Sequence, residues 1–170
     1  MKRNGKGKEY DFDGYLIYEG EYSNSQKNGK GKEYYQNDNL MFEGEYKNNL
    51  RWNGNIYDPK NNNIYQLKNG KGFIKEFDYN GNLIFEGDFS NGKRNGKGKE
   101  YYDNGSLMFE GDYLNEKRNG KGKEYYFNNI LYFEGEYLND MKNGKGKEYN
   151  KYYDIYMMKK EKVNHILMKN

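Results

Sequence analysis

A unit of about 24 residues recurs along the chain, and this repeat limits the possible fold more than any other feature. The segment Asn-Gly-Lys-Gly begins at Asn4, Asn28, Asn69, Asn95, Asn119 and Asn143. A second motif, aromatic-Glu-Gly-acid-aromatic, is called the acidic box below and is centred on Gly20, Gly44, Gly87, Gly111 and Gly135. A short unit repeated at a near-constant period predicts a stack in which each copy packs against its neighbours.

Composition indicates how such a stack could hold together. Hydrophobic residues make up only 34% of the 170 residues and the mean hydropathy is −1.41, whereas Phe, Trp and Tyr reach 18%. Apolar contacts must therefore be largely aromatic. The 22 glycines stand in register with the repeat, which indicates backbone positions that a side chain would obstruct.

One unit, residues 95–118, has the pattern of a β-hairpin. A first strand over 97–102 is followed by a turn at 103–106, and a second strand covers 107–113. Alternation predicts one face with Leu107, Phe109, Gly111 and Tyr113 and the other with Met108, Glu110 and Asp112. In the first strand it separates Gly96, Gly98, Glu100 and Tyr102 from Lys97, Lys99 and Tyr101, unless a bulge intervenes.

The lysines of each unit can lie beside the acids of neighbouring strands. We interpret them mainly as solvated cross-strand charge ladders. A dedicated anion site is the alternative. For attachment to acidic phospholipids, the candidate contacts are Lys97, Lys99, Lys121, Lys123, Lys159 and Lys160.

The acidic box followed by Gly-x-Gly resembles the MORN repeat, in about six to seven copies of its variant form. The resemblance covers residues 4–149. It implies an all-β fold: one elongated, twisted antiparallel sheet of consecutive hairpins, with glycines and aromatic rings along a groove. The box glycines are then structural, and the candidate partner-binding residues are Tyr18, Tyr22, Phe42, Tyr46, Trp52, Phe85, Phe89, Phe109, Tyr113, Phe133 and Tyr137.

Two regions depart from the repeat. Within an array that spans 1–150, a shortened, irregular unit is expected at about 53–68. There Trp52 is interpreted as filling a bend in the stack, or alternatively as a binding hot spot. Residues 151–170 are expected to form a degenerate final hairpin or a C-terminal cap that covers the last edge.

The sequence offers little for catalysis. It has no cysteine, one histidine and no phosphate-binding loop, and its paired carboxylates recur in every unit. We therefore expect no enzyme, no cofactor and no metal site. No signal-peptide pattern is present at the start, which favours the cytoplasm, with a cytoskeletal or membrane-adjacent position implied by the family.

The function expected from these features is a non-catalytic scaffold that binds a segment of another protein through its aromatic groove or a sheet edge. Binding to acidic phospholipid membranes is one alternative, and capture of a toxin protein, as in antitoxin-like relatives, is another. Self-association could use the sheet edges or the C-terminal segment. The two acids of every acidic box and a net charge of only +3 argue against nucleic acid as a partner.

Overall fold

The computed structural model describes residues 2–60 and 63–149, and this part of the chain is all β with no helix. Its thirteen strands all lie within these described ranges. They are β1 (Gly5–Tyr10), β2 (Leu16–Ser23), β3 (Gln26–Tyr34), β4 (Leu40–Lys47), β5 (Leu50–Tyr57), β6 (Ile64–Leu67), β7 (Gly72–Phe77), β8 (Leu83–Ser90), β9 (Lys93–Tyr101), β10 (Leu107–Leu114), β11 (Lys117–Tyr125), β12 (Leu131–Leu138) and β13 (Met141–Glu148). The predicted hairpin stack is confirmed, whereas the expected hairpin or cap at 151–170 lies outside the described residues.

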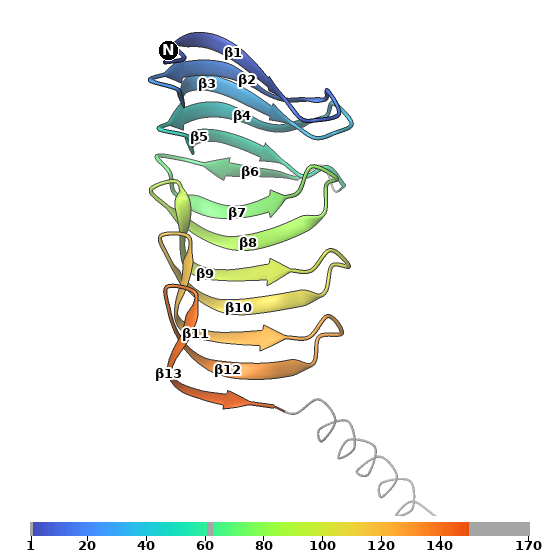
Figure 1. Cartoon of the computed structure of the whole chain (residues 1–170), viewed down its shortest axis with the longest axis vertical. Helices are drawn as coiled ribbons and strands as arrows, with labels where there is room; N and C mark the ends of the chain where they lie inside the picture. Colours follow the sequence, from blue (N-terminus) through green and yellow to red (C-terminus); the bar gives the residue numbers. More distant parts are fainter. Residues whose placement is uncertain (1, 61–62, 150–170) are drawn as a thin grey trace, which may run out of the picture.

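The strands follow one another in chain order, and β1 and β13 lie at opposite ends of the stack (Figure 1). The expectation of a single sheet is wrong, because the strands form a six-stranded sheet, β1 to β6, and a seven-stranded sheet, β7 to β13. Between β6 and β7 only the bridge Lys68↔Lys71 is formed. The interior hairpins of the repeat pair glycine with glycine, as in Gly87↔Gly98, but β6 is four residues long and carries no acidic box. Leu67 stands opposite Gly54, where a box strand has glycine, so β6 offers the next strand a side chain in place of the glycine.

Two kinds of connection alternate along the stack. Box strands lead into the next strand through two-residue turns such as Asn115-Glu116, whose φ values are 50° and 76°. Positive φ at both positions is typical of the type I′ turn, which matches the twist of paired strands. The other connections are longer. At the turn predicted over 103–106, Gly105 has φ 78° and Tyr102 N–H donates to the Ser106 carbonyl at 2.9 Å.

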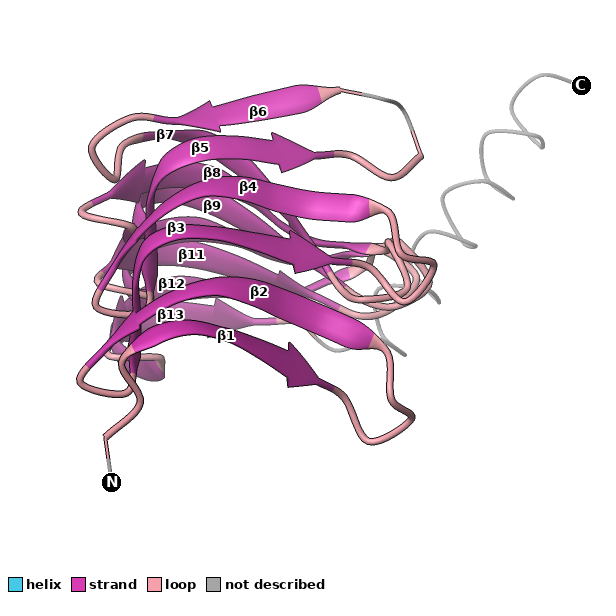
Figure 2. Cartoon of the chain, turned by 90° about the horizontal axis from the view of Figure 1, so that it is seen from above, coloured by secondary structure: helices cyan, strands magenta, loops and turns pink. Residues whose placement is uncertain are grey.

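A bulge at the Asn-Gly of the repeat interrupts the pairing of β2 with β3, β8 with β9, β10 with β11 and β12 with β13. Gly87 pairs with Gly98 and Phe89 pairs with Arg94, so one box residue, Asp88, faces the three residues 95–97. Gly96 lies within this bulge with φ 121°, a conformation that favours glycine. Seen along the stack, the strands are correspondingly bent rather than straight (Figure 2). Beyond the bulge, Gly98 and Glu100 keep the faces predicted by simple alternation.

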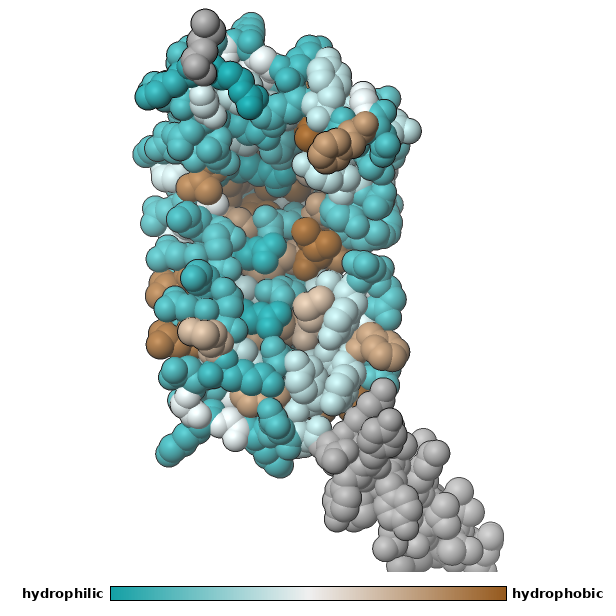
Figure 3. Space-filling view, viewed as in Figure 1, coloured by the Kyte–Doolittle hydropathy of each residue, from teal (hydrophilic) through white to brown (hydrophobic). Residues whose placement is uncertain are grey.

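The core consists of two largely aromatic clusters. The first contains Tyr18, Phe42 and Tyr46 and continues through the aliphatic residues of the irregular region to Ile74 of β7, so it crosses from one sheet to the other. The second contains Phe85, Phe109 and Phe133 with the tyrosines beside them. Figure 3 shows one face of the molecule, on which hydrophobic surface gathers near the middle of the stack between hydrophilic margins. Aromatic packing is therefore the main apolar contact in the regular units.

Trp52 lies where the two sheets meet. Its carbonyl accepts a hydrogen bond from Gly70 N–H at 2.7 Å, and Gly70 belongs to the turn between β6 and β7. A Cβ on Gly70 would lie 2.9 Å from Cζ3 of the indole ring. Lys47 Nζ lies 4.5 Å from the centre of the Trp52 ring. These contacts support the interpretation that Trp52 fills the irregularity of the stack, and a role as a binding hot spot stays a prediction.

Candidate binding surfaces

The box aromatics pack flat against the glycines of the strands beside them. A Cβ on Gly111 would lie 2.7 Å from Cζ of Phe109, and a Cβ on Gly122 of the adjoining strand would lie 2.4 Å from the same atom. Neighbouring rings then meet edge to face, with Phe109 and Tyr137 centroids 5.3 Å apart at 85°. Each such pair contributes about 0.5–1.5 kcal/mol beyond its area burial. The structural role predicted for the box glycines thus has a direct physical reason, since they make room for the rings.

Arginine side chains cover this layer of rings. The guanidinium carbon of Arg118 lies 4.2 Å from the centre of the Phe109 ring. Its nitrogens contact Glu100 at 2.5 Å and Glu124 at 2.8 Å. Arg94 stands over Phe85 in the same way, at 4.1 Å. Together these charges form a lid over the aromatic face.

The expectation that the eleven candidate rings line an open groove must be corrected. Nine of them are buried, with exposed fractions of 0–7%: Tyr18, Tyr22, Phe42, Tyr46, Phe85, Phe109, Tyr113, Phe133 and Tyr137. Trp52 and Phe89 are half-buried. Cationic side chains help to cover the rings, as Arg118 covers Phe109 and Lys27 covers Tyr18. Sequence reasoning missed this cover because it gave Arg94 and Arg118 no role. The rings leave a partner little surface to contact.

The lid also keeps the Glu100 carboxylate charged. Burial opposes the ionisation of Glu100, but hydrogen bonds from Arg118 and Tyr113 outweigh it, and the pKa of Glu100 lies below its ordinary value. The Tyr113 hydroxyl donates to Glu100 Oε1 at 2.6 Å. Burial and this hydrogen bond raise the pKa of Tyr113. The cluster is therefore a closed set of structural ion pairs and gives no sign of a separated acid and base.

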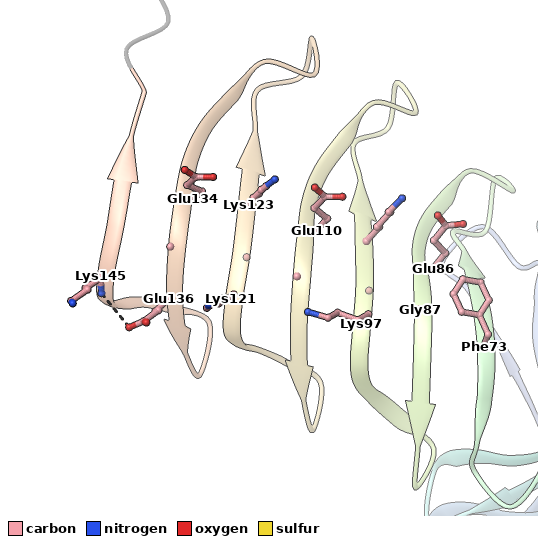
Figure 4. A pocket seen from close by; sticks show the side chains of 15 residues that line it. Phe73, Glu86, Gly87, Lys97, Glu110, Lys121, Lys123, Glu134, Glu136 and Lys145 are labelled. Carbon is pink, nitrogen blue, oxygen red and sulfur yellow. Dashed lines mark hydrogen bonds between the residues drawn. The ribbon is translucent and has the colours of Figure 1, made fainter.

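An open channel lies on the opposite face of each sheet. In the seven-stranded sheet it has a volume of about 690 Å³, and its floor is the backbone of Gly87, Gly98, Gly111, Gly122 and Gly135. Figure 4 shows the charged residues that border it, including Glu110, Glu134, Lys121 and Lys123. The six-stranded sheet has an equivalent channel of about 770 Å³ over Gly20, Gly31 and Gly44. Both channels have a floor of glycines and borders of lysine and glutamate, and they are called the glycine channels below.

The borders of the channels are the charge ladders predicted from the sequence. Lys99 pairs in register with Glu110, and Lys123 with Glu134, so that opposite charges face each other across neighbouring strands. Lys97 Nζ reaches Asp112 at 2.6 Å. All four described lysines proposed as lipid contacts, Lys97, Lys99, Lys121 and Lys123, line this channel, whereas Lys159 and Lys160 lie outside the described residues.

Tyrosines support one row of carboxylates. Tyr101 Oη donates to Glu86 Oε1 at 2.6 Å, and Tyr125 Oη donates to Glu110 Oε1 at 2.7 Å. Burial opposes the ionisation of Glu86, but hydrogen bonds from Tyr101 and Lys75 outweigh it and lower its pKa. Charged carboxylates at fixed positions therefore border the channel at neutral pH.

The second acid of four of the five boxes, Glu21, Asp88, Asp112 and Glu136, has a further role that sequence reasoning missed. Asp88 Oδ2 accepts a hydrogen bond from Lys97 N–H at 3.1 Å, and Asp112 Oδ2 accepts one from Lys121 N–H at 3.0 Å. These amides belong to the bulge, where the ladder is interrupted. The constant spacing of nine residues between the acid and the lysine is the signal that could have revealed this contact.

The comparisons with known proteins agree with this architecture. The family model of the MORN repeat matches residues 18–40, 42–52, 85–107, 109–129 and 133–150, which is more than half of the chain. The chain belongs to the MORN repeat family. MORN repeats are commonly protein-binding or membrane-binding modules without enzymatic activity of their own. The matches omit residues 53–84, where β6 breaks the regular pattern, and the comparison with curated proteins gives no match.

Within the described ranges, no group of three or more His, Cys, Asp or Glu side chains is arranged to hold a metal ion. Over the same residues, no helix has the length and apolar character needed to cross a membrane.

Proposed function

We propose that this MORN chain is a non-catalytic module that holds an extended segment of a partner protein in its glycine channels. The observation that carries the proposal is the channel of about 690 Å³ in the seven-stranded sheet, open and floored by backbone. The buried rings on the other face are already occupied with the glycines and the arginine lid. The accessible recognition surface is therefore the polar face.

The dimensions of the channel suit a polypeptide that crosses the strands. Neighbouring strands lie about 4.8 Å apart, so charges of the same sign along one border recur about every 10 Å, the span of about three residues of extended chain. An extended segment could place small or apolar side chains on the glycine floor. Its charged side chains would then find residues of either sign at the borders, such as Lys123 and Glu134.

The same borders disfavour anionic phospholipid as the main ligand. Each lysine faces a carboxylate on the adjoining strand, as Lys123 faces Glu134. The net charge of the whole chain is only +3. Attraction to an anionic surface depends on uncompensated basic charge, which these ladders lack.

Selection from a library of random extended peptides, followed by mapping of photo-crosslinks, tests the proposal. Selected peptides should crosslink to the channel borders, and the double variant Lys99→Glu with Lys123→Glu should bind them at least tenfold more weakly. The matched control is Lys68→Glu with Lys117→Glu, which makes the same charge change at exposed residues outside the channel. Equal binding by the channel variant and the control would refute the proposal, as would salt-sensitive sedimentation with phosphatidylserine vesicles in the absence of peptide binding.

A further inference from the structure

The same eight residues, Arg-Asn-Gly-Lys-Gly-Lys-Glu-Tyr, occur three times in the chain, at 3–10, 94–101 and 118–125. The second and third copies lie in β9 and β11, each of which pairs with a box strand on both sides. The first copy contains β1, which among the described residues pairs with β2 alone. The contacts that the copies in β9 and β11 make with the preceding box strand therefore indicate which groups the unpaired edge of β1 can bind.

A preceding box strand makes three contacts with the interior copy in β9. Its ring, Phe85, packs on Gly98, where a Cβ would lie 2.5 Å from Cζ, and is covered by Arg94. Its second acid accepts the hydrogen bond from Lys97 N–H at 3.1 Å. Its first acid accepts the hydrogen bond from Tyr101 Oη at 2.6 Å.

The contacts around β11 are the same. Phe109 packs on Gly122, Asp112 accepts from Lys121 N–H at 3.0 Å, and Glu110 accepts from Tyr125 Oη at 2.7 Å. In both copies the three contacts come from one aromatic and two acids of a single extended segment. In both interior positions the octapeptide therefore binds an acidic box through the same three contacts.

The corresponding positions of β1 are accessible. A Cβ on Gly5 would meet no heavy atom of the described chain within 4 Å, whereas at Gly96 and Gly120 it would meet the carboxylate of the preceding box. The Arg3 side chain is 67% exposed, and Tyr10 is 57% exposed. Because the amides of Lys97 and Lys121 point toward the preceding strand, the equivalent amide of Lys6 points to the free edge.

We propose that the free edge of β1 binds an extended acidic segment of a different protein, with the pattern aromatic-Glu-Gly-acid-aromatic. In the register of β11 on β10, the first aromatic lies opposite Glu9, the Glu opposite Lys8 and the Gly opposite Gly7, while the last aromatic lies opposite Arg3. The second acid accepts the hydrogen bond from Lys6 N–H. Lys6, Gly7 and Lys8 also line the channel of the six-stranded sheet, whereas no residue of β1 lines the channel of the seven-stranded sheet.

Within the described ranges, a second copy of the chain has no unpaired segment of this pattern to supply. Each of the five box strands, β2, β4, β8, β10 and β12, is already paired on both sides. The other free edge of the described stack is β13, which carries Lys145 and Lys147 where β1 carries Lys6 and Lys8. Pairing of the two edges would place lysine near lysine, and such like charges are a common device against edge-to-edge association.

The test uses the full chain and a fluorescent peptide that copies residues 107–114, Leu-Met-Phe-Glu-Gly-Asp-Tyr-Leu, with neutral solubilising ends. Fluorescence anisotropy should show saturable binding that weakens at least tenfold when both acids of the peptide are replaced by Lys. Lys8→Glu should weaken binding of the original peptide by a similar factor. A peptide with Lys in place of its Glu should recover binding to Lys8→Glu.

The matched control is Lys147→Glu, which makes the same change at the equivalent position of β13 and should leave binding intact. The channel variant Lys99→Glu with Lys123→Glu should also bind the box peptide normally. Failure of the edge proposal can therefore be told apart from failure of the channel proposal. On peptide addition, the amide resonance of Lys6 should shift in ¹H–¹⁵N spectra. Equal binding by Lys8→Glu and the native chain would overturn the proposal, as would equal binding of the lysine peptide. Concentration-dependent self-association that Lys8→Glu abolishes would overturn it in favour of a second copy.

Discussion

Packing of the Phe109 ring on Gly122 predicts a strong energetic coupling between these two positions. A Cβ at position 122 would lie 2.4 Å from Cζ and 2.5 Å from Cε2 of the ring. Gly122→Ala should therefore destabilise the chain, because the ring is fully buried beneath Arg118 and has no free space to move into. Apart from the Phe109 ring, the atom nearest to this methyl group is Tyr137 Cε2, at 3.2 Å, so the severe overlap is absent in a background with Phe109→Ala.

The magnitudes follow from these contacts. Phe109→Ala should cost about 3–5 kcal/mol as a large-to-small core change. Gly122→Ala alone should cost about 1–3 kcal/mol through overpacking. In the Phe109→Ala background it should be neutral or stabilise by about 0.5–1 kcal/mol, since Ala orders a strand better than Gly. The coupling energy of the cycle is then about 1–4 kcal/mol.

Urea unfolding of the native chain, both single variants and the double variant, followed by far-UV circular dichroism, measures the coupling. Phe109→Leu serves as a milder partner if Phe109→Ala fails to fold. Gly105→Ala is the control, because its φ is 78° and no atom lies within 4 Å of its Cβ position. It should cost about 1–2 kcal/mol with either residue at position 109. Additive effects of Phe109→Ala and Gly122→Ala would refute the ring-on-glycine packing.

Three further predictions concern the charged groups. Arg118→Ala should destabilise the chain by about 3 kcal/mol in urea unfolding, because it removes the guanidinium that pairs with both Glu100 and Glu124, of which Glu124 keeps Lys142 at 3.2 Å. An effect no larger than that of Lys117→Ala would contradict a lid. The pKa of Glu100 is lower in the folded chain than the unfolded value of about 4.5, so the stability that its charge contributes is present above that value and is lost as pH falls through the folded pKa. Glu100→Gln should therefore flatten the acid limb of a curve of unfolding free energy against pH. An unchanged limb would contradict the assigned shift. Asp112→Ala should cost about 1–2 kcal/mol by removing the acceptor of Lys121 N–H, and hydrogen exchange of that amide should quicken; unaltered exchange would show that this bond does not hold the bulge.

Much of the fold could be predicted because the same alternation of aromatic and charged residues occurs in several units. The hairpin, the turn at 103–106, the faces of Phe109, Glu110 and Tyr113 and the lysine ladders all follow from alternation. Met108 is an exception. It was expected on the charged face, yet its Sδ lies 3.9 Å from Nη2 of Arg118, because the register shifts between Leu107 and Phe109. The position of a bulge cannot be predicted from the alternation of residue types along the strand.

The candidate site could be predicted less well, for two physical reasons. The direction of Arg118 depends on the bend at Gly120, which carries this residue back over Phe109, and no linear pattern gives that angle. The break after β6 depends on the glycine that Ile64–Leu67 lacks, since Leu67 lies opposite Gly54 where a regular box strand has glycine. The sequence therefore indicated the right residues for the core but assigned them to an open groove.

Hydroxyl-radical footprinting of the native chain with mass-spectrometric readout tests most directly the claim that the box rings are buried. Phe42, Phe85 and Phe109, each 0% exposed, should be protected, while Phe12 and Phe127, at 111% and 60%, should be modified rapidly. Modification of Phe85 and Phe109 at the rate of Phe127 would contradict the account.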